Sequence, residues 1–330
     1  MFVRASSAFF CLFFLFHGCS ASAPIQLKYT AAGPTPEILA TYEAWFGPSN
    51  HISVGYSSNN PDVLRRQIEE AKALGISGFV VDWYGDRDPF IDQSYATLQG
   101  LAAKEKFHIA MMYDENNPAA GATDEVIADF TAFHNDYLSA TSPGHEAYLT
   151  YQGRPMIFVF PHGGHTDWAR VREVVNQWNP KPWLIQENLP GPHPQAFDGF
   201  YPWVNPGAEG WKADGSNWGQ SYLDDFYHTM AAKYQDDIVV GGAWPQFNDS
   251  KASWSLNRHM SARCGQTLRD TFNEWKKFFP AGQTIPFLMI ETWNDYEEGT
   301  DIERSIPACN GQPAPKSLKE TEENVPRPAQ

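Results

Sequence analysis

Eight short apolar runs, separated by segments with helical periodicity, most constrain how this chain of 330 residues can fold. One helical segment shows the pattern, because Asn60-Pro-Asp62 is a helix start signal, apolar residues follow at helical spacing, and Gly75 is a stop signal. Strand-then-helix order predicts an α/β fold, a single-domain (β/α)8 TIM barrel over residues 24–309. A doubly wound open sheet is the alternative, but it usually carries a glycine-rich phosphate loop after its first strand, and none follows here. The predicted strands are 38–46, 78–83, 109–113, 156–160, 183–186, 199–201, 239–244 and 286–292, and the predicted helices are 60–75, 93–106, 124–138, 168–178, 222–234 and 267–279.

The N-terminus has the pattern of a secretory signal peptide. A basic start is followed by an apolar stretch, Ala8 to Phe16, which is too short to span a bilayer. Residues 1–23 end in Ala21-Ser-Ala23, which resembles a signal peptidase site, while Phe16-His-Gly-Cys19 is a degenerate lipobox that would leave Cys19 lipidated. We therefore expect a secreted or periplasmic protein, or one lipid-anchored at the cell envelope, and no membrane span.

Two further features concern the mature chain. Cys264 and Cys309 remain after export, so an oxidising compartment predicts a disulfide between them, with two buried free thiols as the alternative. Residues 310–330 are rich in proline and charge and have almost nothing to bury, which predicts a disordered tail.

Composition limits the class of ligand. A formal charge of −15 and a pI near 5.0 argue against nucleic acid and anionic membranes as partners. Aromatic residues make up 15% of the chain and include 12 tryptophans, an excess that fits sugar rings stacking on indoles, although a tryptophan-rich core is the alternative. An oligosaccharide or polysaccharide is therefore the expected partner.

Polar and aromatic residues gather where the predicted strands end. The loops after strand C-termini build the active site of a barrel, so side chains there favour function, although a single acid at a strand end often caps the next helix. The recurrence around one rim is harder to explain by capping alone. The residues at these positions are Tyr42, Glu43 and Trp45, then Asp82, Trp83 and Tyr84, then Tyr113, Asp114 and Glu115, and finally Trp203, Trp244, Asn294 and Asp295.

The last predicted strand runs into a cluster of six acidic residues between Ile290 and Glu303. Glycoside cleavage needs one protonated carboxyl group to donate to the leaving oxygen and one carboxylate to act as base or nucleophile. Asp295 and Glu298 are the candidates, because a spacing of three places both on one side of a turn, where repulsion and burial would raise one pKa. Two acids three residues apart are also common on solvated helices.

These residues resemble two glycoside hydrolase families. The segment Trp293-Asn-Asp295-Tyr296-Glu297-Glu298 resembles the eighth-strand motif of family 71, the α-1,3-glucanases, and Glu298-Gly-Thr-Asp-Ile-Glu303-Arg-Ser-Ile-Pro307 resembles family 99, the endo-α-mannosidases. The likeness spans roughly residues 41–307. The segments that also resemble family 99 are Tyr42-Glu-Ala-Trp45-Phe-Gly47, Gly55 to Arg65, Phe79-Val-Val-Asp-Trp83-Tyr84 and Ala196 to Tyr201.

Both resemblances imply a (β/α)8 barrel that cleaves α-linked glycans without a cofactor. Glu298 matches the general acid/base of family 99, and Asp295 stands where that family has a Glu that deprotonates the sugar 2-hydroxyl. The shorter side chain puts that retaining route in doubt. Family 71 has Asp at this position and inverts through a water molecule. The acid that lines the family 99 site from the third strand matches Asp114 or Glu115, and the sequence does not choose between them.

We therefore expect an exported, endo-acting, monomeric glycoside hydrolase of α-mannan or α-glucan, with Glu298 as acid and Asp295 as base. A non-catalytic glycan-binding protein on the same barrel is one alternative. The other alternative is a polysaccharide-assembly protein. The export signal argues against it, because nucleotide-sugar donors are cytoplasmic. The expected glycan-binding residues are Tyr42, Trp45, Asp82, Trp83, Tyr84, Asp114, Glu115, Tyr201, Trp244, Trp254, Trp293 and Asn294.

Two other patterns are less specific. His162-Gly-Gly-His165 has a metal-like spacing, but no further acid is placed beside it, so we expect no metal. Arg258 and Arg263 follow Trp254 in a segment that resembles a family 99 loop near the substrate, and the alternative is that they form surface salt bridges.

Overall fold

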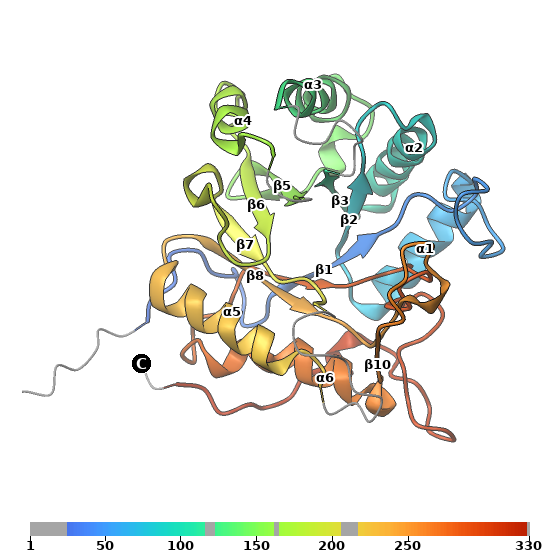
Figure 1. The fold of residues 1–330 in the computed structure, drawn as a ribbon, viewed down its shortest axis with the longest axis vertical. Coiled ribbons are helices and arrows are strands. Elements are labelled where there is room, and N and C mark those ends of the chain that lie inside the picture. The colour runs from blue at the N-terminus through green and yellow to red at the C-terminus, as the bar shows by residue number, and fades with distance from the viewer. Residues whose placement is uncertain (1–24, 116–122, 162–164, 206–216, 329–330) are drawn as a thin grey trace, which may run out of the picture.

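The computed structural model describes residues 25–115, 123–161, 165–205 and 217–328, and it confirms the predicted barrel (Figure 1). Eight parallel strands pair in the order β3-β2-β1-β11-β8-β7-β6-β5, and β3 pairs with β5 to close the ring. The short strand β4, Thr150–Tyr151, adds to β5 in the antiparallel sense. The barrel strands are β1 Glu37–Tyr42, β2 Gly78–Trp83, β3 His108–Asp114, β5 Arg154–Phe160, β6 Trp183–Glu187, β7 Gly199–Tyr201, β8 Ile238–Ala243 and β11 Phe287–Ile290.

Helices cover the outside of the barrel and largely follow the predicted ranges. The predicted helix 124–138 is two pieces, α3 and a π-helical turn, η1 His134–Leu138. No α-helix joins β6 to β7, because residues 188–198 are few, contain three prolines and form only the turn η3, Pro194–Ala196. The helices are α1 Pro61–Leu74, α2 Pro89–Glu105, α3 Thr123–Phe133, α4 Trp168–Val175, α5 Gln220–Lys233 and α6 Gln266–Asn273, which η6, Glu274–Lys277, extends.

Local sequence signals explain where two of these helices begin. The side chain of Asn60 accepts a hydrogen bond from the backbone N–H of Asp62, and Pro61 occupies the first turn of α1. Asp88 caps α2 in the same way, since one of its carboxylate oxygens accepts from the N–H groups of Phe90 and Ile91. Each cap lies just beyond a barrel strand and its loop, at the end of the barrel that carries the site.

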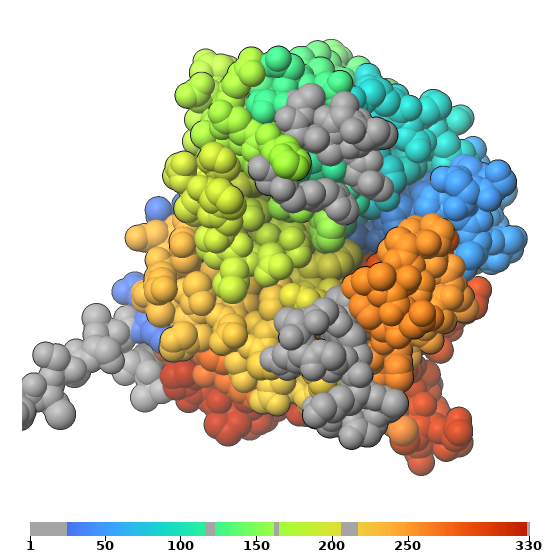
Figure 2. All heavy atoms as spheres, in the orientation of Figure 1, coloured from blue at the N-terminus to red at the C-terminus, as the bar shows by residue number. Residues whose placement is uncertain are grey.

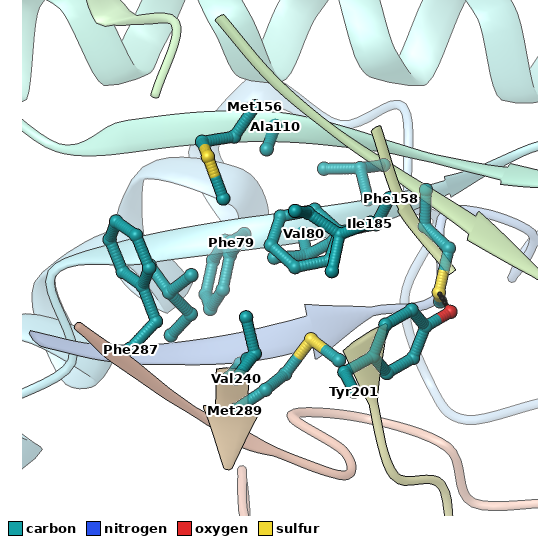
Figure 3. Packing of buried hydrophobic residues seen from close by; sticks show 14 of the residues in the cluster. Phe79, Val80, Ala110, Met156, Phe158, Ile185, Tyr201, Val240, Phe287 and Met289 are labelled. Carbon is teal, nitrogen blue, oxygen red and sulfur yellow. Dashed lines mark hydrogen bonds between the residues drawn. The ribbon is translucent and has the colours of Figure 1, made fainter. Parts of the chain in front are cut away.

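The barrel is filled by side chains and is not a channel. Figure 3 shows Val80, Phe158, Ile185, Val240 and Met289 meeting between the strands that carry them, and all of these residues are buried. Such filling removes a large apolar area from water and stabilises the closed sheet.

The C-terminal segment differs from the expected disordered tail. From Ser317 onward this segment lies along α6 and η6, and Leu318 and Thr321 in the turn η7, Leu318–Thr321, are buried. Asn273 donates a hydrogen bond to the carbonyl oxygen of Thr321, and the guanidinium of Arg327 donates to the carbonyl oxygens of Phe279 and Gln283. One buried apolar side chain and a few hydrogen bonds to backbone carbonyl groups hold this segment on the surface.

The structure confirms the disulfide between Cys264 and Cys309. It joins the turn before α6 to the segment that follows the acidic loop, a separation of 45 residues. Within the described part of the chain, no helix is long and apolar enough to cross a membrane. The expected signal peptide and Cys19 lie outside the described residues.

Candidate active site

A cavity of about 700 Å³ opens at the C-terminal ends of the strands. It has the size of a typical small-molecule site and mixes carboxylates with aromatic rings. It continues into a smaller chamber of about 260 Å³, with which it shares Trp45, Asn50, His51, Tyr84 and Asp88. The lining residues of the main cavity are Glu43, Trp45, Asn50, His51, Asp82, Tyr84, Asp88, Met112, Asp114, Phe160, Trp203, Ser253, Trp254, Asp295 and Glu298.

Strand alternation decides which strand-end residues reach this cavity. Asp82 faces the cavity, while the next residue, Trp83, points outward and donates to Asp92 of α2. Asp114 lines the cavity, whereas Tyr113 turns away and donates to Asp129 of α3. The alternative left open by the sequence is thereby resolved in geometry, since Asp114 and not Glu115 is the third-strand acid that lines the cavity.

Three carboxyl groups from neighbouring strands form the floor of the cavity: Glu43, Asp82 and Asp114. Burial raises the pKa of Glu43 well above its usual value, and repulsion by Asp82 raises it further. Burial and repulsion by Asp114 likewise raise the pKa of Asp82. Glu43 and Asp82 share a hydrogen bond that favours the proton on Glu43. Burial and mutual repulsion thus favour the protonated forms of Glu43 and Asp82.

The two candidate catalytic carboxyls lie on the tight loop after β11. The backbone N–H of Asp295 donates to the hydroxyl of Thr292, and Asp295 Oδ1 accepts from the N–H groups of Glu297 and Glu298 at 2.9 and 2.8 Å. This is the local hydrogen bonding that Asp provides in turns. Because the turn folds back on itself, Asp295 and Glu298 both line the same cavity.

The surroundings of Asp295 and Glu298 shift the pKa values of the two carboxyl groups through different contacts. Burial and repulsion by Glu298 raise the pKa of Asp295, while the two backbone N–H donors oppose the rise. Burial raises the pKa of Glu298, opposed by a hydrogen bond from Trp254 and by the charge of Arg258. The two backbone N–H groups favour the ionised form of Asp295, while burial and repulsion by Glu298 favour its protonated form; at Glu298 the indole N–H of Trp254 and the charge of Arg258 oppose the effect of burial.

Aromatic rings form the walls. Trp45 contacts Tyr84 and Trp254 with ring centroids 6.3 Å apart in each case, and Phe160 meets Trp203 edge-on at 5.2 Å. Flat apolar walls above a polar floor suit a sugar ring, which has an apolar face and a rim of hydroxyls. Trp45, Tyr84 and Trp254 were expected from the sequence, while Trp203 appeared there only as a strand-end residue.

Sequence reasoning missed His51 and its partner. The imidazole stacks on Trp45 at 4.9 Å with 4° between the rings, and its Nδ1 lies 2.7 Å from Glu297 Oε2. Glu297 also accepts the backbone N–H of Ile52, so one buried carboxylate holds the whole turn beside the cavity. No local motif marks His51, because it lies in a long loop and its partner follows some 250 positions later in the chain.

Several expected glycan-binding residues do not reach the cavity. Tyr42, Trp83, Trp244 and Trp293 are fully buried behind it, and Trp244 donates its indole N–H to the carbonyl oxygen of Trp218. Glu115 accepts a hydrogen bond from Thr166 on the helix side. Alternation explains Tyr42, Trp83 and Glu115, since each is the sequence neighbour of a residue that lines the cavity. Trp244 and Trp293 lie beyond the ends of β8 and β11 and pack into the core.

The other two corrections concern residues inside the barrel end. The hydroxyl of Tyr201 lies 3.2 Å from the sulfur of Met112 and 3.2 Å from the carbonyl oxygen of Val159. Asn294 exchanges two hydrogen bonds with the backbone of Glu43, at 2.8 and 3.0 Å. Neither residue lines the cavity, and Asn294 instead fixes the position of Glu43.

The less specific patterns have structural roles where they are described. Arg258 pairs with Asp249 at 2.8 Å and Arg263 with Asp270 at 2.5 Å, and neither arginine lines the cavity. His162 to Gly164 lie outside the described residues. Within the part of the chain that is described, no group of three or more His, Cys, Asp or Glu side chains is arranged to hold a metal ion.

Comparison with solved structures relates this barrel to known glycosidases. An endo-α-mannosidase of family 99 from Bacteroides thetaiotaomicron superimposes with a TM-score of 0.59 at 19% identity, over 81% of this chain and 87% of that one. A glycoside hydrolase-like protein superimposes with a TM-score of 0.57 at 14% identity, over 86% of this chain and 90% of that one. These likenesses show a shared fold. Among curated proteins, no significant match to the sequence is found.

The family follows from the sequence itself. The model of glycosyl hydrolase family 71 matches residues 50–309, a span that includes every cavity residue except Glu43 and Trp45. The match covers well over half of the chain, and it ends beyond the loop that carries Asp295 and Glu298. The chain therefore belongs to glycosyl hydrolase family 71 and is a glycosidase.

Proposed function

We propose that this protein hydrolyses α-linked mannan or glucan, with Glu298 as general acid and Asp295 as general base. The observation that carries the proposal is the placement of both carboxyls on one turn, in a cavity with aromatic walls and three further buried carboxyl groups. Glu298 donates a proton to the glycosidic oxygen as the bond to the anomeric carbon breaks. Asp295 accepts a proton from the water that attacks that carbon, so the anomeric configuration inverts.

The short arm of Asp295 supports this inverting route. One of its oxygens, Oδ1, is held by two backbone N–H groups, which leaves Oδ2 to accept the proton of a water molecule. A carboxylate fixed in this way cannot extend toward the sugar, and a water molecule between base and sugar spans the difference. Nuclear magnetic resonance of the first product should show the β-anomer, and an α-anomer would overturn the inverting assignment.

The extension of the cavity supports endo action. The smaller chamber beside Trp45 and Asp88 continues the site away from the acid loop. A polymer therefore has room for sugar units on that side of the cleaved bond. Products longer than a monosaccharide, released early from an α-linked polymer, would support internal cleavage, whereas steady release of monosaccharide alone would argue for exo action.

The first test is the release of reducing ends from a panel of α-mannans and of α-1,3-, α-1,4- and α-1,6-glucans. Glu298→Gln should lower turnover about 10³-fold, the usual contribution of a general acid, without changing the unfolding temperature. Glu69→Gln, on the exposed face of α1, is the matched control and should keep full activity. Activity retained by Glu298→Gln would remove this residue from the mechanism.

Silence across the panel would favour the second candidate, a glycan-binding protein on the same barrel. Binding without turnover would then appear as quenching of tryptophan fluorescence by one of the glycans.

We also propose that the protein is exported. The signal-like N-terminus and the disulfide between Cys264 and Cys309 support this, because structural disulfides persist in oxidising compartments. Fractionation of cells that produce the full chain should place it outside the cytoplasm, and purely cytoplasmic protein with free thiols would contradict the proposal.

A further inference from the structure

A protruding arm lies directly on the acidic loop. The strands β9, Phe247–Asn248, and β10, His259–Met260, pair in the antiparallel sense, and the arm between them is drawn in orange beside the blue loop that follows β1 (Figure 2). Asp249 organises this arm, because its carboxylate accepts the backbone N–H groups of Leu256 and Arg258 and the hydroxyl of Ser255. The arm is thus a built structure and not a loose loop.

The arm touches the proposed acid at two points. The backbone N–H of Asn248 donates to the carbonyl oxygen of Glu298 at 2.6 Å, and the indole N–H of Trp254 donates to Glu298 Oε1 at 3.0 Å. Trp254 leaves 43% of its surface exposed, which is unusual for so large an apolar side chain. Its edge rests on Trp45, so the indole is held between the cavity wall and the carboxyl group.

The hydrogen-bonding chemistry of indole restricts where the acid proton can lie. Indole N–H is only a donor, so Glu298 Oε1 must be the acceptor. When Glu298 is protonated, its proton is therefore on Oε2. We propose that Trp254 is a positioning residue that orients the Glu298 carboxyl and leaves Oε2 to carry and deliver the proton to the glycosidic oxygen. This inference rests on the proposed role of Glu298.

The same contact sets the balance between the two forms of Glu298. A donor to Oε1 stabilises the carboxylate, so Trp254 lowers a pKa that burial raises. The charged groups that face Glu298 act in both directions. Arg258 lowers the pKa of Glu298, whereas Asp249 and Glu297 raise it. Asp295 interacts with Glu298 as well, and its own pKa is raised by that neighbour. The remaining titratable groups of the cavity are Glu43, Asp82, Asp114, Asp88, Tyr84 and His51.

The experiment removes the indole N–H donor of Trp254 and keeps an aromatic side chain at this position. Trp254→Phe should lower kcat about tenfold, because the carboxyl loses its orientation, with little change in KM. The alkaline limb of the kcat/KM profile should move up by about one pH unit, since the lost charge-assisted hydrogen bond no longer favours the carboxylate.

Trp45→Phe is the matched control. The indole N–H of Trp45 makes no hydrogen bond to any described residue, so the same chemical change there should leave the alkaline limb in place. A Trp254→Phe variant with unchanged kcat and an unchanged alkaline limb, but a raised KM, would show that Trp254 is only a platform for sugar and would overturn the inference.

A second measurement separates this inference from the proposed function. The fluorescence of Trp254 should titrate with the carboxyl of Glu298, and this signal should vanish in both Trp254→Phe and Glu298→Gln. If no glycan is hydrolysed but the signal is present, the proposed function fails while the contact stands. A wild-type titration identical to that of Glu298→Gln would overturn the inference whatever the activity.

Discussion

Five tryptophans of this barrel fall into two groups with different surroundings. Trp45 and Trp254 line the cavity, whereas Trp83, Trp244 and Trp293 are fully buried behind it. In the sequence, Trp45, Trp83, Trp244 and Trp293 have the same setting at the end of a predicted strand, yet only Trp45 of these four lines the cavity. The difference shows that a residue type near the rim of a barrel does not reveal its role until the direction of its side chain is known.

The acids of the last strand show the same contrast. Glu298 opens into the cavity, while Glu291, only seven positions earlier, is fully buried and accepts the backbone N–H of Val204 at 2.6 Å. Burial raises the pKa of both groups. Only Glu298 lines the cavity and can exchange its proton with a ligand, so a pKa raised by burial does not by itself indicate a function.

The largest expected effect is a loss of stability when a buried tryptophan is replaced. Trp293→Ala should lower the free energy of unfolding by about 3–5 kcal/mol, because it leaves a large cavity beside Phe79. Chemical denaturation of the variant would measure this. Trp293→Phe is the control and should cost clearly less, since the indole N–H of Trp293 makes no hydrogen bond to a described residue. Near-equal stability of the Ala variant would place Trp293 outside the core.

The next effect is weaker substrate binding when a tryptophan that lines the cavity is replaced. Trp45→Ala should raise KM about tenfold, as about 1.4 kcal/mol of ring contact is lost. Its effect on unfolding should be smaller than that of Trp293→Ala because its ring borders open space as well as His51. A variant with unchanged KM and a strong loss of stability would reverse the proposed division between the two tryptophans.

The smallest expected effect is the pH dependence of stability that the buried Glu291 causes. The folded pKa of Glu291 is raised above its ordinary value of 4.5, so the folded state holds a proton that the unfolded chain releases above that pH. Stability contributed by this proton is present at low pH and falls as pH rises, by about 1.4 kcal/mol for each pKa unit of difference.

Glu291→Gln removes this titration. The variant should therefore match the wild type in acid and gain stability relative to it as pH rises above the ordinary glutamate pKa. Urea unfolding at several pH values measures the difference. A variant whose stability stays parallel to that of the wild type at every pH would mean that Glu291 is ionised in the folded protein.

The sequence predicted most of the fold because barrel strands and helices leave strong local signals. Each of the eight predicted strands coincides with an observed one within a few residues, and Asn60 and Gly75 mark α1 from cap to cap. The contacts of the C-terminal segment with α6 could not be read from its composition, because that surface is built by residues distant in the sequence.

Hydrophobic period, residue spacing and one contiguous motif were enough to predict the barrel, the glycoside hydrolase resemblance and the candidate acids Asp295 and Glu298. Folding was needed to bring Glu43 to the cavity floor, His51 to Glu297 and Trp254 to Glu298. The physical reason is closure of the ring, which brings the ends of distant strands together and sends alternate side chains inward or outward.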